Sequence, residues 1–420
     1  MNKTTVESSA GGISSGNEFR GRLLLILSAA IGLSASMNAV MLYSIGSFIG
    51  PLESEFGWAR GDISLAATLL TFGLFLAGPM IGLACDRWGA AVVGSLSLVS
   101  FAALLFIMAN SLQSLAGLWT FYFLIALVGA GSTPIVLVRP ISAAFDRQRG
   151  LALGISLTGA GLVGFWIPNL VTAVVAQSGW RTAYGVLALI ALVAAPVVYL
   201  GFRATERSEA AKGTATVATV GLTMQAARKT AAFWSMSALS VTMALGIGGL
   251  MVHLVPMFRD LGAAPATAAG ITSMIGIASV VGRLCIGLCL DRFSPHRVAV
   301  AVIGLGILGI LVLKFGGLAF AIVGVVFIGL LLGAELDMLA FLTARLFGQR
   351  AFGAIYGWFY SVYALAFGIS PVVIGRLRDA AGDYGLAMNT SIAMLLVAVA
   401  AAMVLGRWTP VRDAGAAQQG

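Results

Sequence analysis

Apolar runs of about twenty residues recur from one end of this 420-residue chain to the other. A helix of roughly that length is needed to cross the ~30 Å hydrocarbon core of a bilayer. Within lipid every backbone amide must find a partner in the chain, so only helices and closed barrels can span it. The sequence lacks the short alternating segments that are typical of barrel strands. Because 59% of its residues are hydrophobic, well above the share in soluble domains, we predict an all-α membrane protein.

The apolar runs predict twelve transmembrane helices in two sets of six. The longest polar break, 203–230, separates the sixth helix from the seventh. The predicted helices cover residues 23–49, 62–84, 91–109, 115–144, 150–176, 183–202, 231–257, 266–290, 298–314, 318–346, 352–375 and 385–406. The expected parts of the chain are a disordered cytoplasmic tail (1–20), an N-terminal six-helix bundle (21–203), a cytoplasmic connector (204–230), a C-terminal six-helix bundle (231–407) and a cytoplasmic tail (408–420).

The 25 Lys and Arg residues indicate the orientation of the chain. With the N-terminus inside, 17 fall in cytoplasmic loops and tails, six fall outside, and Arg139 and Arg283 lie within the membrane. Positively charged loops favour the cytoplasmic side, so we predict cytoplasmic termini in a multi-pass protein of a cell inner membrane. Residues 1–20 show no signal-peptide pattern. The net charge of +9 is therefore interpreted as orientation charge, and nucleic acid is not an expected partner.

The two halves of the sequence repeat each other. The stretch GLACDRWG (82–89) returns as GLCLDRFS (287–294), an offset of 291 − 86 = 205 residues between the two aspartates. Pro168 in the fifth predicted helix returns as Pro371 in the eleventh, an offset of 371 − 168 = 203. Two six-helix halves in the same orientation are typical of a secondary transporter. No nucleophile–base pair or metal-ligand cluster suggests an enzyme, and no cofactor is expected.

With its doubled G-x-x-x-D-R motif, the chain resembles the major facilitator superfamily over residues 20–410. It is further similar to the branch of monocarboxylate porters and oxalate–formate antiporters. Five stretches carry that similarity: EFGWARGDISLA (55–66), RGLALGISLTGAG (149–161), HLVPMFRDLG (253–262), GRLCIGLCLDR (282–292) and FGAIYG (352–357). The resemblance implies the major facilitator fold, with helices 1, 4, 7 and 10 lining a central cavity.

The repeated loops are the predicted gate. Gly82 and Gly287 allow helices to approach closely. Asp86 and Asp291 lie near the cytoplasmic surface, where each can meet a cation or a helix N-terminus. The resemblance implies that this contact closes the cytoplasmic side in one state; the alternative is a solvated loop that only sets orientation. The gating residues are predicted to be Gly82, Asp86, Arg87, Asp291 and Arg292.

Arg283 is the main candidate for binding a substrate. It lies eight residues before Asp291, or roughly 12 Å into the membrane at 1.5 Å per residue. Its helical face also carries Ser279, Gly276 and Thr272, a polar stripe in an apolar helix. The resemblance implies that an arginine here binds the substrate carboxylate, and a planar guanidinium suits that role. The alternative is a structural ion pair with an acid of helix 10.

Helix 10 carries two acids, Glu335 and Asp337, in an apolar run. They lie two residues apart, about 200° around the helix, so only one can point straight into the cavity. Loss of water raises the pKa of a carboxyl group, and a nearby arginine lowers it. We therefore predict that one acid carries a coupling proton while the other pairs with an arginine. The alternative is that both acids form structural pairs.

Other polar residues complete the predicted substrate site. Arg139 is either a second anion site or the partner of a helix 10 acid. His253 is a lone histidine, and such a residue is more often structural than functional. The aromatic stripe of helix 11, at 356, 360, 363 and 367, is either packing or a clasp for the apolar body of an anion. Besides Arg283, the predicted substrate-binding residues are Arg139, His253, Tyr43, Asn38, Ser279 and Tyr360.

We therefore expect a monomeric carrier that moves a small organic monocarboxylate by alternating access, coupled to protons. Two departures from the branch limit what the resemblance implies about the substrate. Tyr43 stands near where many monocarboxylate porters place a lysine. Helix 11 lacks the lysine associated with oxalate exchange. An organic-anion exchanger without a coupled proton is an alternative. Drug efflux is another, because the glycine row before Pro168 resembles an antiporter motif: Gly150, Gly154, Gly159, Gly161 and Gly164.

Overall fold

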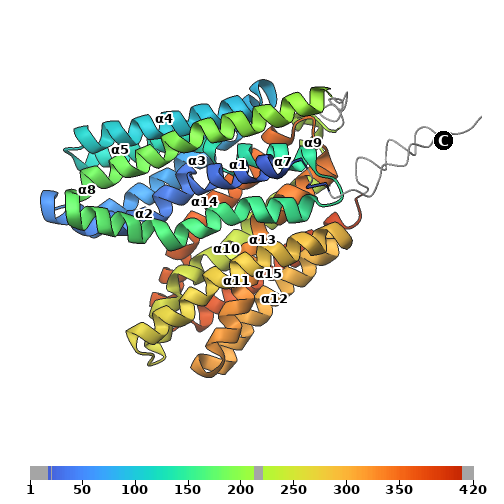
Figure 1. The fold of residues 1–420 in the computed structure, drawn as a ribbon. Coiled ribbons are helices and arrows are strands. Elements are labelled where there is room, and N and C mark those ends of the chain that lie inside the picture. The colour runs from blue at the N-terminus through green and yellow to red at the C-terminus, as the bar shows by residue number, and fades with distance from the viewer. Residues whose placement is uncertain (1–17, 20, 212–220, 409–420) are drawn as a thin grey trace, which may run out of the picture.

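The computed structural model describes residues 18–19, 21–211 and 221–408, and this part of the chain is helical (Figure 1). The expected tails at 1–17 and 409–420, and residues 212–220 of the connector, lie outside the described residues. The helices of the first half are α1 (Leu23–Ser34), α2 (Met37–Phe56), α3 (Arg60–Trp88), α4 (Ala90–Ser111), α5 (Leu115–Gly129), η1 (Ala130–Ser132), α6 (Pro134–Leu137), α7 (Arg139–Ala144) and α8 (Arg149–Ala211). Those of the second half are α9 (Met224–Arg228), α10 (Ala231–Asp260), α11 (Pro265–Arg292), α12 (Pro295–Gly316), η3 (Gly317–Phe320), α13 (Ala321–Phe347), α14 (Phe352–Ala381) and α15 (Gly385–Leu405).

Ten helical stretches of the described chain are long and apolar enough to cross a membrane. Two of them, Arg149–Arg207 with 59 residues and Pro295–Phe347 with 53, far exceed one crossing. Each is interrupted by a glycine with a backbone conformation that other residues rarely adopt: Gly179 has φ 81°, and Gly317 has φ 54°. The chain therefore reverses within both stretches.

The stretch expected as one helix over 115–144 is broken in the structure into α5, η1, α6 and α7. The breaks coincide with Pro134 and Pro140, which lack the backbone N–H that a continuous helix needs. The expectation of a continuous helix was wrong here. The consequence is that Arg139 begins the short helix α7 rather than lying within a long one.

The two halves pack side by side, the first drawn in blue to green and the second in yellow to red (Figure 1). Helix α3 packs on α14, and the first part of α8 packs on α11. Glycines permit both contacts: a Cβ on Gly82 would lie 2.0 Å from the carbonyl oxygen of Gly353, and one on Gly150 would lie 2.1 Å from that of Gly287. Only glycine fits at these crossings.

One end of the bundle gathers the chain segments that precede and follow the helices. Glu18 bonds to the loop before α8, Leu222 bonds to Phe347 at the end of α13, and Gly406 lies against His296 at the start of α12. We call this the termini end. Gly221 and Gly348 form an isolated bridge there.

Candidate functional site

The centre of the site is an ion pair between α11, the predicted helix 8, and α13, the predicted helix 10. Nη1 of Arg283 lies 3.1 Å from Oδ1 of Asp337. Arg283 is 8% exposed and Asp337 is fully buried. The two helices approach closely because α13 carries Gly333, where a Cβ would lie 2.1 Å from the carbonyl oxygen of Ser279 on α11. This approach brings a guanidinium and a carboxylate together in an apolar interior.

Glu335 has a different partner from Asp337. Its Oε2 accepts a hydrogen bond from the Tyr363 hydroxyl of α14, and the residue is fully buried. Two residues separate the acids along α13, so their side chains leave the helix in different directions. One acid thus meets a cation and the other a neutral phenol.

Four polar atoms around this pair are buried without a hydrogen-bond partner among the residues that the structure describes. They are Nε of Arg283, Oδ2 of Asp337, Oε1 of Glu335 and Oη of Tyr356. Buried polar groups are normally satisfied, and an unsatisfied charged one is costly. A group of such atoms in one region indicates a place for a ligand, a proton or water. The guanidinium is held through Nη1 alone and keeps its Nε edge available for a carboxylate.

The glycine row of α8 forms a wall beside the ion pair. A Cβ on Gly161 would lie 3.8 Å from Nε of Arg283, and one on Gly154 would lie 3.4 Å from Oδ2 of Asp337. The ring of Tyr43 rests on Gly164, 3.0 Å from where its Cβ would be. These glycines let α8 approach the ion pair closely, since a Cβ on Gly154 would also lie 2.6 Å from the carbonyl oxygen of Arg283.

The aromatic stripe of α14 runs beside the pair. Ring centroids are 6.1 Å apart for Tyr356 and Tyr360, 6.4 Å for Tyr360 and Tyr363, and 5.8 Å for Tyr363 and Phe367. Asn38 on α2 donates a hydrogen bond of 3.5 Å to the Tyr360 hydroxyl, across the two halves. The stripe is packed, and the hydroxyls of Tyr360 and Tyr363 bond to Asn38 and Glu335.

Three predicted substrate-binding residues have other partners in this conformation. Arg139 pairs with Asp86 at 3.1 Å and donates to the carbonyl oxygen of Cys85, rather than meeting an acid of α13. His253 lies between the Tyr384 hydroxyl at 3.2 Å and the carbonyl oxygen of Pro371 at 3.1 Å, an arrangement that suits a structural residue. Ser279 donates to Gly276 of its own helix.

The gate aspartates each cap a helix of the opposite half. Asp86 accepts hydrogen bonds of 3.0 Å from the backbone N–H groups of Gly353 and Ala354, at the start of α14. Asp291 accepts bonds of 2.6 and 2.9 Å from those of Gly150 and Leu151, at the start of α8. A carboxylate at a helix N-terminus satisfies unpaired N–H groups and meets the positive end of the helix dipole. These two caps join the halves at the termini end. The two flanking arginines, Arg87 and Arg292, are exposed, and the Arg87 guanidinium lies 5.8 Å from the centre of the Trp88 ring.

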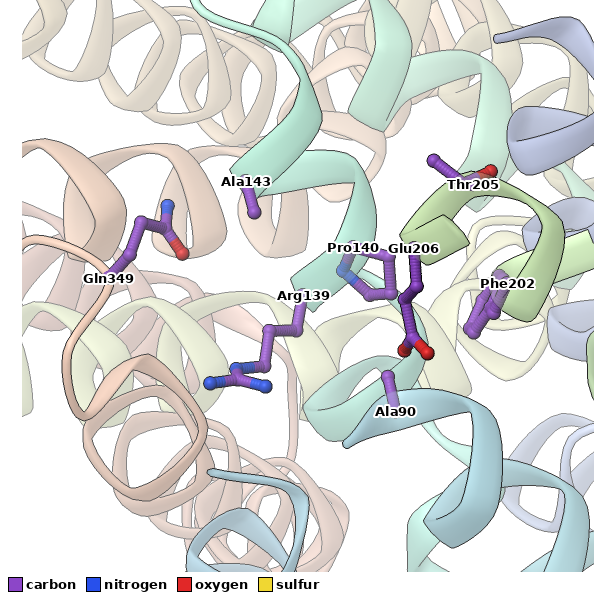
Figure 2. A pocket seen from close by; sticks show the side chains of 8 residues that line it. All are labelled: Ala90, Arg139, Pro140, Ala143, Phe202, Thr205, Glu206 and Gln349. Atoms are coloured by element: carbon purple, nitrogen blue, oxygen red, sulfur yellow. The ribbon is translucent and has the colours of Figure 1, made fainter. Parts of the chain in front are cut away.

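A cavity of about 140 Å³ adjoins the Asp86–Arg139 pair (Figure 2). Its lining comes from α4, α7, the end of α8 and the loop before α14: Ala90, Arg139, Pro140, Ala143, Phe202, Thr205, Glu206 and Gln349. Gln349 crosses between the halves, because its Nε2 donates to the carbonyl oxygen and the hydroxyl of Ser142. Gln349 belongs to no sequence motif, so this contact could not be predicted from the sequence.

Comparisons with known proteins bear on the whole chain. A family model described as Major Facilitator Superfamily matches residues 31–371. Monocarboxylate transporter 12 of Mus musculus is 24% identical over 274 residues, 57% of this chain and 56% of that protein, so the chain spans about half the length of this curated relative. A crystal structure of the E. coli fucose:proton symporter has a TM-score of 0.68 at 15% identity and covers 93% of this chain and 99% of its own. A structure of such a transporter in the outward conformation also has a TM-score of 0.68, at 14% identity, with 91% and 98% covered.

Proposed function

Because the chain belongs to the major facilitator superfamily, and is therefore a multi-pass membrane transporter and not an enzyme, we propose that it carries a small organic monocarboxylate together with a proton. The family resemblance read from the doubled motif is confirmed. The substrate, the proton and the transport cycle are our proposal. It rests chiefly on one observation, the half-satisfied ion pair between Arg283 and Asp337.

The ion pair supports a carboxylate substrate. Arg283 is a permanent cation with its Nε edge unused, and a carboxylate can take two parallel hydrogen bonds from a guanidinium. A substrate carboxylate would then replace Asp337 as the partner of Arg283. Curated relatives that bear the name monocarboxylate transporter point to the same class of cargo.

Charge balance in the site calls for a proton when a substrate carboxylate replaces Asp337 as the partner of Arg283. The empty site holds one cation and one anion, so the pair is neutral. When a substrate carboxylate pairs with Arg283, Asp337 is left as a second anion in an apolar interior, which is costly. Protonation of Asp337 restores neutrality, so one proton accompanies one carboxylate. Glu335, which bonds to Tyr363, is the alternative proton carrier.

The same pair favours symport over obligatory exchange. An exchanger that depends on its substrate to neutralise a buried arginine cannot reorient while empty. Here Asp337 neutralises Arg283 when no substrate is bound. The empty carrier can therefore return, which is what net uptake requires.

For the topology, we propose twelve crossings in two six-helix halves, 21–203 and 231–407, joined by a connector at 204–230. The reversals at Gly179 and Gly317 support twelve crossings, since they divide the two longest stretches. The predominance of Lys and Arg in loops at the termini end supports a cytoplasmic location for that end in an inner membrane. We propose that the described conformation is the outward-facing state, because Asp86 and Asp291 join the two halves at the termini end.

Transport by purified protein in liposomes tests the proposal. Vesicles with an acidic exterior should accumulate a labelled short-chain monocarboxylate, and collapse of the pH gradient should stop accumulation. Uptake that is unaffected by the gradient but needs a carboxylate inside the vesicles would instead indicate exchange.

A further inference from the structure

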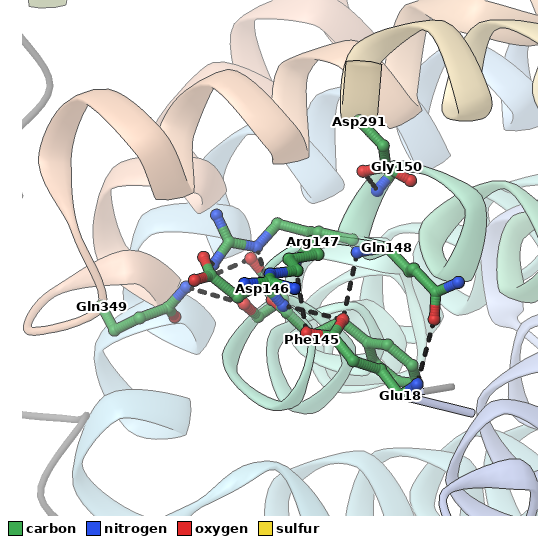
Figure 3. Close-up of polar contacts among 10 residues, drawn as sticks. Glu18, Phe145, Asp146, Arg147, Gln148, Gly150, Asp291 and Gln349 are labelled. Carbon is green, nitrogen blue, oxygen red and sulfur yellow. Dashed lines mark hydrogen bonds and ion pairs between the residues drawn. The ribbon is translucent and has the colours of Figure 1, made fainter. Parts of the chain in front are cut away.

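The carboxylate of Glu18 lies against the loop between α7 and α8. It accepts hydrogen bonds from three consecutive backbone N–H groups, at 3.3 Å from Asp146, 3.3 Å from Arg147 and 3.0 Å from Gln148 (Figure 3). In return the N–H of Glu18 donates to Oε1 of Gln148 at 3.1 Å. Four hydrogen bonds thus join the segment ahead of the first helix to a loop more than a hundred residues away.

Aromatic contacts anchor the same segment. The rings of Phe19 and Phe145 lie 5.2 Å apart, and the Arg22 guanidinium lies 5.4 Å from the centre of the Phe145 ring. Phe145 itself is fully buried at the start of the loop. Glu18, Phe19 and Arg22 therefore hold to the loop by polar and apolar contacts together.

This loop leads directly into the helix end that the gate uses. The N–H groups of Gly150 and Leu151 bind Asp291 of the second half. Figure 3 shows the carboxylates of Glu18 and Asp291 flanking the chain between Asp146 and Gly150. Of the five backbone N–H groups at and just before the start of α8, three bind Glu18 of the same half and two bind Asp291 of the opposite half.

The second half repeats the arrangement with backbone groups. Leu222, ahead of α9 and α10, donates to the carbonyl oxygen of Phe347 at 2.8 Å, and Gly221 forms a bridge with Gly348. Gly221 has φ 140°, and a Cβ there would lie 2.6 Å from the same carbonyl oxygen. This second loop leads into the N–H groups at the start of α14 that bind Asp86.

We propose that Glu18 and the 221–222 segment are positioning elements of the gate. Each holds the loop that precedes a helix N-terminus, so that the helix faces the aspartate of the opposite half. This inference rests on the proposed alternating access, because it assigns the two segments to the closed state of the termini end. Without its hold on the loop, the start of α8 samples other orientations, the Asp291 cap weakens, and the population shifts towards opening of this end.

Thiol labelling from the cytoplasmic side measures that shift. Phe341, 3% exposed on α13, has the Arg149 guanidinium of the opposite half 6.0 Å from its ring centre, so we expect separation of the halves to expose it. Phe341→Cys serves as the reporter in a background with Cys85, Cys285 and Cys289 changed to Ala, in inside-out vesicles. Glu18→Ala should raise its labelling rate about three- to tenfold, since bonds to a charged acceptor are lost. Glu18→Gln retains one acceptor oxygen and should lie between Glu18→Ala and the parent.

Three companion variants make the result specific. Gly221→Ala should raise labelling in the same direction, through the second loop. Combining Glu18→Ala with Asp291→Asn should add little to Asp291→Asn alone, because both act on the start of α8. Asp379→Ala is the matched control: this exposed acid pairs with its neighbour Arg378 at the far end of α14 and should leave labelling unchanged.

The outcomes separate this inference from the proposed gate. Raised labelling in Asp291→Asn with parental labelling in Glu18→Ala overturns the positioning role and leaves the gate intact. Parental labelling in both overturns the gate and the positioning role together. A rise in Asp379→Ala equal to that in Glu18→Ala also overturns it, because any lost acid would then have the same effect.

Discussion

Arg283 and Asp337 share a single contact, 3.1 Å between Nη1 and Oδ1, and each keeps one buried polar atom without a partner in the described part of the chain. A purely structural ion pair is stable when both partners are fully satisfied. This one leaves the Nε edge of the guanidinium and one carboxylate oxygen unused. These two unused atoms support the proposal that a substrate carboxylate binds here.

The first prediction concerns Arg283 as the substrate ligand. Arg283→Ala should weaken carboxylate binding about ten- to a hundredfold, because a charged hydrogen-bond partner is lost in a desolvated site. Arg283→Lys keeps the charge but loses the planar fork, so it should be impaired as well. Binding of a labelled monocarboxylate to purified protein measures both effects. Parental affinity in Arg283→Ala would exclude Arg283 as the ligand.

A double variant separates substrate binding from ion pairing. If Arg283 served only to neutralise Asp337, Arg283→Ala combined with Asp337→Asn would restore binding. The proposed role requires that the double variant binds no better than Arg283→Ala. Expression and thermal unfolding of the double variant are the controls, since neutralising both charges leaves no unpaired ion.

The second prediction concerns the proton. Asp337→Asn removes the acid that must be neutralised when substrate arrives, so acid-driven accumulation should be lost while exchange of labelled for unlabelled substrate continues. Glu335→Gln should keep most gradient-driven uptake if Asp337 is the carrier. The reverse pattern would assign the proton to Glu335, and full accumulation by both variants would refute coupling through α13. In the parent, uptake should rise as the external pH falls, because protonation of the carrier acid precedes entry.

Most of the fold could be predicted from the sequence. The length of the apolar runs predicted the helices, and the repeated aspartate loops predicted the two halves, because both are local patterns. From the sequence, the acids that could form an ion pair with Arg283 were limited to Glu335 and Asp337, but the sequence did not decide between them. That choice depends on how α13 is rotated against α11, and the contact of Gly333 with Ser279 sets the rotation. A close approach of this kind leaves no periodic pattern in the sequence.

Contacts between distant segments were harder to predict. Arg139 was expected to be either a second anion site or the partner of a helix 10 acid. In the structure it pairs with Asp86, at a point where the helix is broken at Pro134 and Pro140. The seat of Glu18 on the loop before α8 had no local signal at all. It is one acid in a polar stretch, and only the fold brings three backbone N–H groups to it.

The third prediction concerns the gate. Asp86→Asn removes the charge that caps α14 and leaves Arg139 as an unpaired cation, so the termini end should open more often. Labelling of Phe341→Cys from the cytoplasmic side should rise about tenfold. Arg139→Ala should raise it less, because Asp86 still holds two backbone N–H groups. Equal labelling in the parent and in Asp86→Asn would mean that the loop only sets orientation.

The last prediction concerns the close approach that creates the site. A Cβ on Gly333 would lie 2.1 Å from the Ser279 carbonyl oxygen, a backbone atom that cannot move aside alone. Gly333→Ala should therefore push α13 away from α11 and separate Arg283 from Asp337. Overpacking of this kind typically costs about 1–3 kcal/mol, so we expect a lower unfolding temperature together with weaker carboxylate binding.

Gly304→Ala on α12 is the matched control, because a Cβ there meets nothing within 4 Å and alanine favours a helix. It should leave both the unfolding temperature and the affinity at or slightly above those of the parent. If Gly333→Ala lowers stability but binds substrate with parental affinity, the spacing of α11 and α13 does not define the site, and Arg283 must reach its ligand by another route.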